Sequence, residues 1–330
     1  MAALVSVVIP TRNRAGLLAR TLGTVLAQRL MELEVVVVDD ASTDETPALL
    51  GAVGDDRLRV IRHPGRRGVA AARNTGIDAA AGRWVAFLDD DDLWAPDKLA
   101  RQVDALVAQP GARWAIDGAV VVDSELRVLW NQLPPPVPDL TIALLTANVV
   151  PGGASGVVAE RGLVVDAGGF DPSLALLADW DLWTRLALRA PAVSIRQSLH
   201  AYRLHGDSMS ARDRNGEDEL RTLEAKYARE REARGVGLDR AAFAFWLADR
   251  RQRGHRRLAA ADGYLRSAGR TGTVSACLHA TAALVWPGSI RHVTTRRATR
   301  MTGGWVDEAE AWLRPLRAPA GPVLATPGGG

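Results

Sequence analysis

Short, continuous apolar runs alternate with segments of helical spacing through the first third of the chain. Runs that are apolar at every position and closed by polar residues predict strands that are buried on both faces. The predicted strands are Leu4–Ile9, Leu33–Val38, Leu58–Arg62 and Trp84–Leu88. Helical spacing lies between them, over residues 14–28, over a segment that ends near residue 50, and over residues 68–80. This alternation predicts an α/β fold, with a mostly parallel, Rossmann-like central sheet and flanking helices.

Acidic residues follow two of the predicted strands at their carboxyl ends. Asp39 and Asp40 close the second strand, and the run from Asp89 to Asp92 closes the fourth. Because ligands of open parallel sheets lie off the carboxyl ends of the strands, we expect both groups in one site. Neighbouring carboxylates repel one another, and a divalent cation with a phosphate ligand offsets that cost. The alternative is an acidic turn in which Asp92 caps the next helix.

The rest of the chain is less regular. Trp114–Val122 predicts another strand, and the proline-rich stretch from Pro134 to Pro138 predicts a loop. Residues 150–156 predict a glycine-rich loop, but one that lacks the Gly-Lys-Ser/Thr ending of a P-loop. Residues 176–189 have helical spacing, and long charged helical patterns follow from Asp213 onward.

Composition narrows the class of protein. The 330 residues carry a net charge of +3 and a single cysteine, Cys277, so no intrachain disulfide can form. The N-terminus lacks a signal-peptide pattern, and no apolar segment reaches the length of a bilayer crossing, so we expect a cytoplasmic protein. The arginine-rich C-terminal region, which includes residues 291–300, is a candidate for peripheral contact with the anionic inner face of a membrane. Nucleic-acid binding is not expected, because the basic residues are mixed with acids and lack interleaved aromatics.

Several short motifs occur in a fixed order. They are Ser6–Arg14, Val36–Asp44, Gly68–Gly76, Trp84–Trp94, Gly168–Asp171, Ala178–Trp183 and Tyr202–His205. Together and in this order they resemble the motifs of inverting family-2 glycosyltransferases with a GT-A fold. The resemblance implies a donor-binding half over residues 1–115 and an acceptor-binding, catalytic half over residues 116–212. We expect a helical extension over residues 213–314 and a disordered, Pro/Gly-rich tail over residues 315–330.

The resemblance implies how a nucleotide-sugar donor is held. Asp40 is expected to accept a hydrogen bond from the base, which favours the N3–H of uracil or thymine and hence a UDP- or dTDP-linked sugar. Asp89 and Asp91 look like the DxD pair of the family. Asp89 and Asp90 are expected on the ribose, and Asp91, with His205, on Mg²⁺ or Mn²⁺. Such a cation stabilises the charge that builds on the leaving diphosphate.

Other residues of these motifs are candidates for contact with the donor. They are Pro10, Thr11, Arg12, Asn13 and Arg73. Two plainer interpretations stay open, a turn-forming role for residues 11–13 and a surface role for Arg73.

Asp179 aligns with the catalytic base of the family. Inversion requires one carboxylate to take the proton of the acceptor hydroxyl as its oxygen attacks the anomeric carbon. Ala178 stands where the family usually carries Glu, and Asp181 is a nearby alternative base on another face of the helix. Trp180 and Trp183 are candidates for an acceptor-sugar platform, with core packing as the alternative.

The sequence therefore predicts a metal-dependent inverting glycosyltransferase. It would move a sugar from a UDP- or dTDP-sugar to a hydroxyl of a glycan, a lipid-linked acceptor or a small molecule. One alternative is a nucleotide-sugar-binding protein without transfer activity, which the missing acid at Ala178 makes conceivable. Another is a sugar nucleotidyltransferase, which normally carries a glycine-rich N-terminal loop, whereas this chain has no glycine before Gly16.

Overall fold

A computed structural model describes residues 3–135, 140–205, 215–253, 257–267, 275–280 and 304–317. The basic segment at 291–300 and the tail from residue 318 lie outside the described residues. The chain divides into two compact units. The first comprises Met1–Leu140, Val150–Arg203 and Gly304–Gly330, and the second comprises Thr141–Val149 and Leu204–Gly303.

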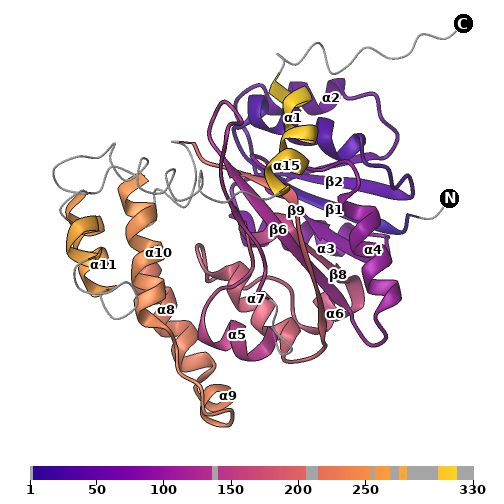
Figure 1. Ribbon diagram of the computed structural model, residues 1–330. Coiled ribbons are helices and arrows are strands. Elements are labelled where there is room, and N and C mark those ends of the chain that lie inside the picture. The colour runs from indigo at the N-terminus through magenta and orange to yellow at the C-terminus, as the bar shows by residue number, and fades with distance from the viewer. Residues whose placement is uncertain are drawn as a thin grey trace, which may run out of the picture. The chain divides into compact units, whose positions relative to one another are not determined.

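One sheet forms the centre of the first unit (Figure 1). Its strands are β1 (Val5–Thr11), β2 (Leu33–Asp39), β3 (Leu58–Arg62), β4 (Trp84–Phe87), β5 (Leu93–Trp94), β6 (Trp114–Val122), β7 (Val128–Gln132), β8 (Val157–Glu160) and β9 (Ala192–Arg203). Their order across the sheet is β3-β2-β1-β4-β8-β6-β9-β5, and β7 pairs with β6. Strands β1 to β4 pair in parallel, whereas β8 runs antiparallel to both β4 and β6. The predicted parallel sheet is confirmed for β1 to β4, and the later strands join it in mixed orientation.

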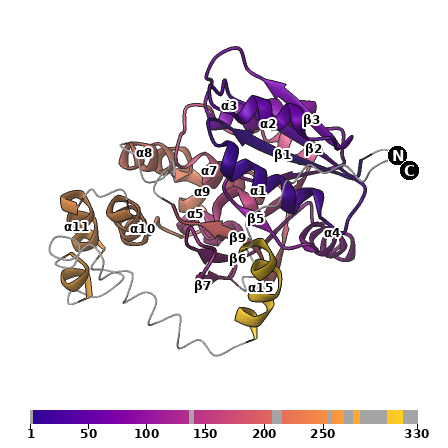
Figure 2. The ribbon, with the colours of Figure 1, turned by 90° about the horizontal axis from the view of Figure 1, so that it is seen from above.

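Helices cover both faces of the parallel strands. The α-helices of this unit that precede β9 are α1 (Ala15–Leu26), α2 (Thr46–Ala52), α3 (Val69–Ala79), α4 (Lys98–Ala108), α6 (Arg161–Asp166) and α7 (Ala178–Ala187). Figure 2 shows α1 and α3 on opposite sides of β1.

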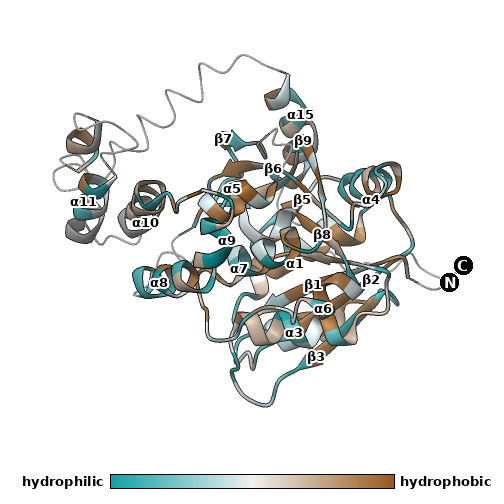
Figure 3. Cartoon of the chain, turned by 90° about the horizontal axis from the view of Figure 1, so that it is seen from below, coloured by the Kyte–Doolittle hydropathy of each residue, from teal (hydrophilic) through white to brown (hydrophobic). Residues whose placement is uncertain are grey.

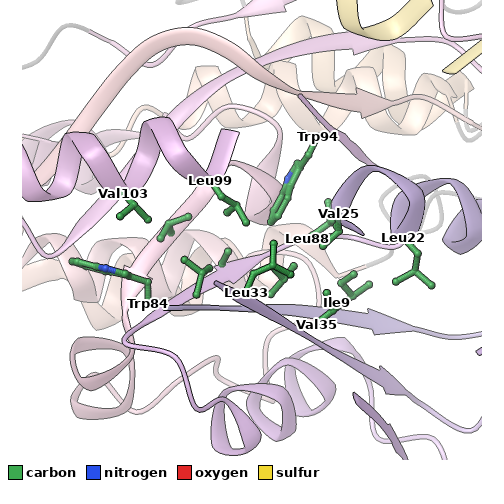
Figure 4. Close-up of a cluster of buried hydrophobic side chains, with 14 of the residues drawn as sticks. Ile9, Leu22, Val25, Leu33, Val35, Trp84, Leu88, Trp94, Leu99 and Val103 are labelled. Carbon is green, nitrogen blue, oxygen red and sulfur yellow. The ribbon is translucent and has the colours of Figure 1, made fainter. Parts of the chain in front are cut away.

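Alternate side chains of the strands fill two separate cores. On one face Ile9 and Val35 pack with Leu22 of α1, in the same cluster as Leu99 and Val103 of α4 (Figure 4). On the other face, side chains of β2 pack against α3. Helix α4 is amphipathic, with hydrophobic and hydrophilic surfaces side by side in Figure 3. Burial on both faces is the physical reason that the first strands are apolar throughout.

A C-terminal helix packs on the sheet of the first unit. Helix α15 (Trp305–Leu313) places Ala309 and Leu313 in a buried cluster with residues of β5, β6 and β9. The chain continues as a 3-10 helix, η3 (Arg314–Arg317), in which Arg317 donates to the Leu126 carbonyl at 2.9 Å. From the sequence, residues 305–314 were expected in the helical extension, and the disordered tail was expected to begin at residue 315. The contacts correct both points for residues 305–317.

The second unit is helical in its described part. It contains most of α5 (Leu140–Thr146) together with α8 (Gly216–Lys226), α9 (Ala228–Glu232), α10 (Arg240–Arg253) and α11 (Arg257–Arg266). The buried Arg231 donates to the Leu145 carbonyl at 2.6 Å, which ties α9 to the end of α5. Among the described helices of the chain, none has the length and apolar character that a bilayer crossing requires.

The close packing of α3 on β1 generates a stability prediction. A Cβ atom added at Gly76 of α3 would lie 2.3 Å from Cγ1 of Val8, so Gly76→Ala should destabilise by about 1–3 kcal/mol through overpacking. A Cβ atom at Gly23, in the interior of α1, meets nothing within 4 Å, and Gly23→Ala should stabilise by about 0.5–1 kcal/mol. Urea-unfolding midpoints, followed by tryptophan fluorescence, measure both changes. Equal midpoints for the two variants would contradict this packing.

Candidate active site

The carboxyl ends of β1, β2 and β4 meet at one edge of the sheet, as the sequence predicts. Thr11, at the end of β1, pairs in register with Asp39 at the end of β2, and Val8 pairs with Phe87 of β4. The Asp89–Asp92 run directly follows β4. It forms a turn, which we call the acid turn, closed by a hydrogen bond from the Asp92 N–H to the Asp89 carbonyl at 3.2 Å.

The acid turn presents its four carboxylates unequally. The side chains of Asp89 and Asp91 are 29% and 13% exposed, whereas that of Asp90 is 6% exposed and Asp92 is fully buried. Asp89 and Asp91 are therefore the two that a ligand can reach. They are also the residues that resemble the DxD pair.

Asp90 is held inside the protein by two partners, one from the last residue of β1 and one from the residue just before α1. Thr11 donates its hydroxyl to one carboxylate oxygen at 2.7 Å, and Arg14 donates to the other at 2.8 Å. Burial, and then repulsion from Asp91, raises the pKa of Asp90 to about 6. The ribose contact of Asp90 stays a prediction, since each of its oxygens accepts one hydrogen bond and its side chain is 6% exposed.

Arg14 is the main counter-charge of this turn. Besides Asp90, it contacts a carboxylate oxygen of Asp91 at 2.8 Å. Burial by itself lowers the pKa of Arg14, but the carboxylates of Asp90 and Asp91 outweigh this effect and raise it. The guanidinium is therefore fully charged and offsets the repulsion within the turn.

Asp92 is bound by residues that lie far away in the sequence. Ser155 donates its hydroxyl to one oxygen at 2.6 Å, and the Arg203 backbone N–H donates to the other at 3.1 Å. Burial, followed by repulsion from Asp91 and Asp89, raises its pKa well above the usual range of an aspartate. The N-cap alternative is not supported, because the helix α4 begins later, with Asp97 as its N-cap residue.

The acid turn fits a divalent cation. Asp89, Asp91 and Asp92 each offer a carboxylate oxygen, and these atoms all lie within 4.8 Å of one another. Hard cations such as Mg²⁺ take oxygen ligands of this kind, usually one or two carboxylates with substrate phosphates. Asp91 was predicted as a ligand and Asp92 was not. His205 lies two residues beyond β9, in the second unit, and its role as a ligand stays a prediction.

Asp40 fixes the loop that precedes α3. One carboxylate oxygen accepts from Nδ1 of His63 and from the Arg67 N–H, both at 2.8 Å, and the other accepts from the Gly68 N–H at 2.8 Å. Burial raises the pKa of Asp40, but the bonds from His63, Arg67 and Gly68 outweigh it and hold the pKa below its ordinary value. Asp40 is therefore an ionised acceptor with a lone pair left for a ligand.

The remaining predicted donor residues differ in their exposure. Arg73 pairs with Asp89 and lies over the ring of Phe170, 4.9 Å from its centroid, so it is a buried counter-charge and not a surface arginine. Pro10 is buried within β1, whereas Arg12 and Asn13 are exposed. Asn13 has a φ of 54° and accepts the Thr43 N–H at 2.7 Å, so it connects two of the loops at this edge.

Asp179 lies in the first turn of α7, next to a glycine-rich segment. Its carboxylate faces Gly153, where an added Cβ atom would lie 3.4 Å from Oδ2. The alternative base, Asp181, is fully buried and binds Arg185 at 2.6 Å, so it is unsuited to meet an acceptor.

The two tryptophans predicted as an acceptor platform are core residues. Trp183 is fully buried, with its ring centroid 5.7 Å from that of Phe87 and 5.9 Å from that of Phe170. Trp180 is 3% exposed. Neither ring has a free face on which a sugar could stack, which corrects the prediction of a platform.

Three residues that contact the carboxylates of the acid turn were not among the predicted site residues. Arg14 and Arg203 stand within the quoted motifs, next to residues that were chosen, and Ser155 stands in the glycine-rich loop. Arg14 lies 76 residues from Asp90, Ser155 lies 63 residues from Asp92, and Arg203 lies 111 residues from Asp92. No local pattern reports such contacts.

Comparison with known proteins finds similarity in the N-terminal part of the chain. Residues 6–154 match the model of a family described as Glycosyl transferase family 2. The chain is 41% identical over 150 residues to the succinoglycan biosynthesis protein ExoO of Rhizobium meliloti, across 44% of this chain and 43% of that protein. It is 35% identical over 104 residues to the Escherichia coli UDP-Glc:alpha-D-GlcNAc-diphosphoundecaprenol beta-1,3-glucosyltransferase WfgD, across 32% of this chain and 41% of that protein. These matches span less than half the length of the two relatives.

A solved structure shares the fold over a longer span. The mannosyltransferase PcManGT from Pyrobaculum calidifontis, in complex with GDP-Man and Mn²⁺, covers 94% of this chain and 87% of its own. The TM-score is 0.54 and the sequence identity is 23%, a likeness that shows the fold. The expected GT-A architecture is confirmed.

The raised pKa of Asp90 predicts how stability depends on pH. Between about pH 4 and pH 6 the folded state keeps the Asp90 proton that the unfolded state has released, so rising pH weakens folding across this window. Asp90→Asn removes this titration. The quantity to compare is the free energy of unfolding of the parent protein minus that of Asp90→Asn, measured without divalent cations. This difference should decrease by on the order of 2 kcal/mol between pH 4 and pH 7. Denaturant titrations at a series of pH values measure the difference, and a constant difference would contradict the burial of this charge.

Proposed function

We propose, from the premise that residues 6–154 belong to glycosyl transferase family 2, that this protein is a metal-dependent inverting glycosyltransferase. The observation that carries the proposal is the acid turn, which presents Asp89 and Asp91 at the carboxyl edge of a GT-A sheet. The proposed reaction moves a sugar from a nucleoside diphosphate to an acceptor hydroxyl.

The donor lies across the carboxyl ends of β1, β2 and β4 in this proposal. Asp40 accepts a hydrogen bond from the base, and Asp89 binds the ribose. Asp91, with Asp92 behind it, holds Mg²⁺ or Mn²⁺, and the cation when bound neutralises the developing charge of the leaving diphosphate. Arg14 and Arg73 already contact these acids and keep their carboxylates in place until the donor arrives.

Asp179 acts as the general base in this proposal. Its carboxylate takes the proton of the acceptor hydroxyl while that oxygen attacks the anomeric carbon from the face opposite the diphosphate. The burial and ion pair of Asp181 support this choice between the two acids. Ala178, which stands where the family usually carries an acid, is only 2% exposed. The replacement of that acid by alanine is therefore at a buried position. That observation weakens the alternative of a binding protein without transfer activity.

A UDP- or dTDP-sugar is the proposed donor class. An ionised Asp40 accepts hydrogen bonds but donates none, which suits the N3–H of uracil and thymine. WfgD is named for a UDP-glucose donor, whereas the PcManGT structure holds GDP-Man, so the base is the first property to test. The acceptor we propose is a glycan or a lipid-linked saccharide, in keeping with the names of ExoO and WfgD, and it would be met at the cytoplasmic face of the membrane.

Two substitutions separate donor binding from transfer. Asp179→Asn should lower the rate of transfer by about 10²- to 10⁴-fold and leave the dissociation constant of the donor unchanged, because the base acts only on the acceptor. Asp91→Asn should weaken Mn²⁺-dependent donor binding by about tenfold or more. Release of nucleoside diphosphate and calorimetric titration measure the two effects. Full activity of Asp179→Asn would remove Asp179 from the mechanism.

Calorimetry with UDP, dTDP and GDP, each with and without Mn²⁺, tests the donor site of the parent protein. We expect binding of UDP or dTDP that strengthens with Mn²⁺ and is weakened by Asp40→Asn, because the amide that replaces one carboxylate oxygen presents a donor to the base. Preference for GDP would overturn the assignment of the base. Failure of the folded protein to bind any of the three nucleotides would overturn the transferase proposal.

A further inference from the structure

A buried ionic cluster lies in the first unit, apart from the acid turn. It consists of Lys98 at the start of α4, Asp117 on β6 and His200 on β9, and all three are fully buried. Asp117 contacts Lys98 Nζ at 2.9 Å through one oxygen and His200 Nδ1 at 2.7 Å through the other. Because an ionised carboxylate only accepts, the proton on Nδ1 of His200 points toward Asp117. We call this group the ionic cluster.

Stability alone is a weak reason for such a cluster. Removing charges from water costs several kcal/mol per ion, and well-packed apolar residues often serve a core equally well or better. The strands β6 and β9 already pair along their length in the sheet.

The cluster packs against the glycine-rich segment Pro151–Gly156, which we call the glycine loop, although its last four residues form the 3-10 helix η1 (Gly153–Gly156) and not the predicted loop. A Cβ atom at Gly152 would lie 2.2 Å from Nε2 of His200, and one at Gly156 would lie 2.9 Å from Cε1 of the same ring. Gly152 also has a φ of 61°, which side chains rarely adopt. The imidazole thus fits directly against the backbone of the loop, at two positions where only glycine leaves room.

Two neighbours of the cluster donate hydrogen bonds to carbonyl groups of the same loop. Gln102, which accepts a hydrogen bond from Lys98, donates to the Gly156 carbonyl at 2.9 Å. Trp94, whose ring lies 4.7 Å from Lys98 Nζ, donates its indole N–H to the Ser155 carbonyl at 2.9 Å. The inner side of the glycine loop is therefore held by the ionic cluster and by the two residues that Lys98 contacts.

The glycine loop also contacts both halves of the proposed reaction centre. Ser155 donates to Asp92 and accepts the Asp89 N–H at 3.1 Å, so it is bonded to both ends of the acid turn. Gly153, two residues earlier, faces the carboxylate of Asp179. The loop is a short, direct connection between the acids proposed for the donor and the acid proposed as base.

We propose that His200, held by Asp117 and Lys98, is a positioning residue that sets the glycine loop and thereby the placement of Asp179 relative to the acid turn. The inference rests on the proposed function, in which Asp179 is the base. An error on the order of 1 Å in such a placement costs about 10²-fold in rate, whereas donor binding depends on the acid turn and on Asp40. Loosening the ionic cluster should therefore lower kcat and spare the donor affinity.

The test compares His200→Ala with Leu106→Ala, a large-to-small change in the buried part of α4 away from the loop. For His200→Ala we expect a fall in kcat of about 10- to 100-fold, with the dissociation constant of the donor within about twofold of the parent value. Leu106→Ala should lose stability and keep its kcat. Nucleoside diphosphate release from UDP-glucose with Mn²⁺ measures kcat, and calorimetry measures donor affinity. A fall in donor affinity equal to the fall in kcat, or an unchanged kcat, would overturn the inference.

A second readout does not depend on activity. Hydrogen exchange at the amides of the glycine loop should accelerate in His200→Ala and stay at the parent rate in Leu106→Ala, with exchange in α1 as the internal reference. Unchanged exchange in the loop would overturn the inference even if the protein proves to be a transferase. Absence of nucleotide binding by the parent protein would instead overturn the proposed function, so the two failures are distinguishable.

A double-mutant cycle tests the contact itself. Gly152→Ala should reduce stability more in the parent protein than in the His200→Ala background, because the side chain that it meets is then gone. If His200→Ala does not fold, His200→Asn replaces it, since the Asn amide can still donate to Asp117 but does not reach Gly152. Additive effects of the two changes on stability would contradict the packing on which the inference depends.

Discussion

The electrostatic repulsion among Asp89, Asp90, Asp91 and Asp92 is the constraint on which the rest of this site depends. Carboxylates this close cannot all remain ionised unless cations or hydrogen-bond donors compensate them. The first unit supplies those partners from several elements: Arg14 from the start of α1, Arg73 from α3, Ser155 from the glycine loop and the backbone of Arg203 from β9. Because each partner comes from a different part of the chain, the turn takes this shape only when the whole sheet has formed.

The same compensation divides the acids by role. The carboxylate oxygens of Asp90 and Asp92 accept hydrogen bonds from protein groups, and these two residues anchor the turn. The side chains of Asp89 and Asp91 remain partly exposed to solvent. A donor and its cation that reach the exposed pair enter a place whose geometry the buried pair has already established. That arrangement lowers the cost of ordering the ligands at the moment of binding, which is the physical advantage of preorganised sites.

Much of the fold follows from local sequence patterns. The apolar runs of β1, β2 and β4 indicate strands buried on both faces, and the helical spacing between them requires parallel pairing through crossovers. Parallel strands place their carboxyl ends together, so the meeting of Asp40 with the acid turn at one edge was predictable. The pairing of β5 and β8 was not, because these strands are short and their partners lie far away in the sequence.

The sequence by itself determined the α/β class and the edge of the sheet that holds the acids, and it limited the candidate base to Asp179 with Asp181 as the alternative, because periodicity, strand direction and motif order are local properties of the chain. The tertiary structure decided which residues are reachable. It buried Trp183 among aromatic rings, paired Asp181 with Arg185 and packed α15 on the sheet of the first unit. Burial and charge pairing depend on residues that are distant in sequence and adjacent only after folding, so no pattern along the chain could reveal them.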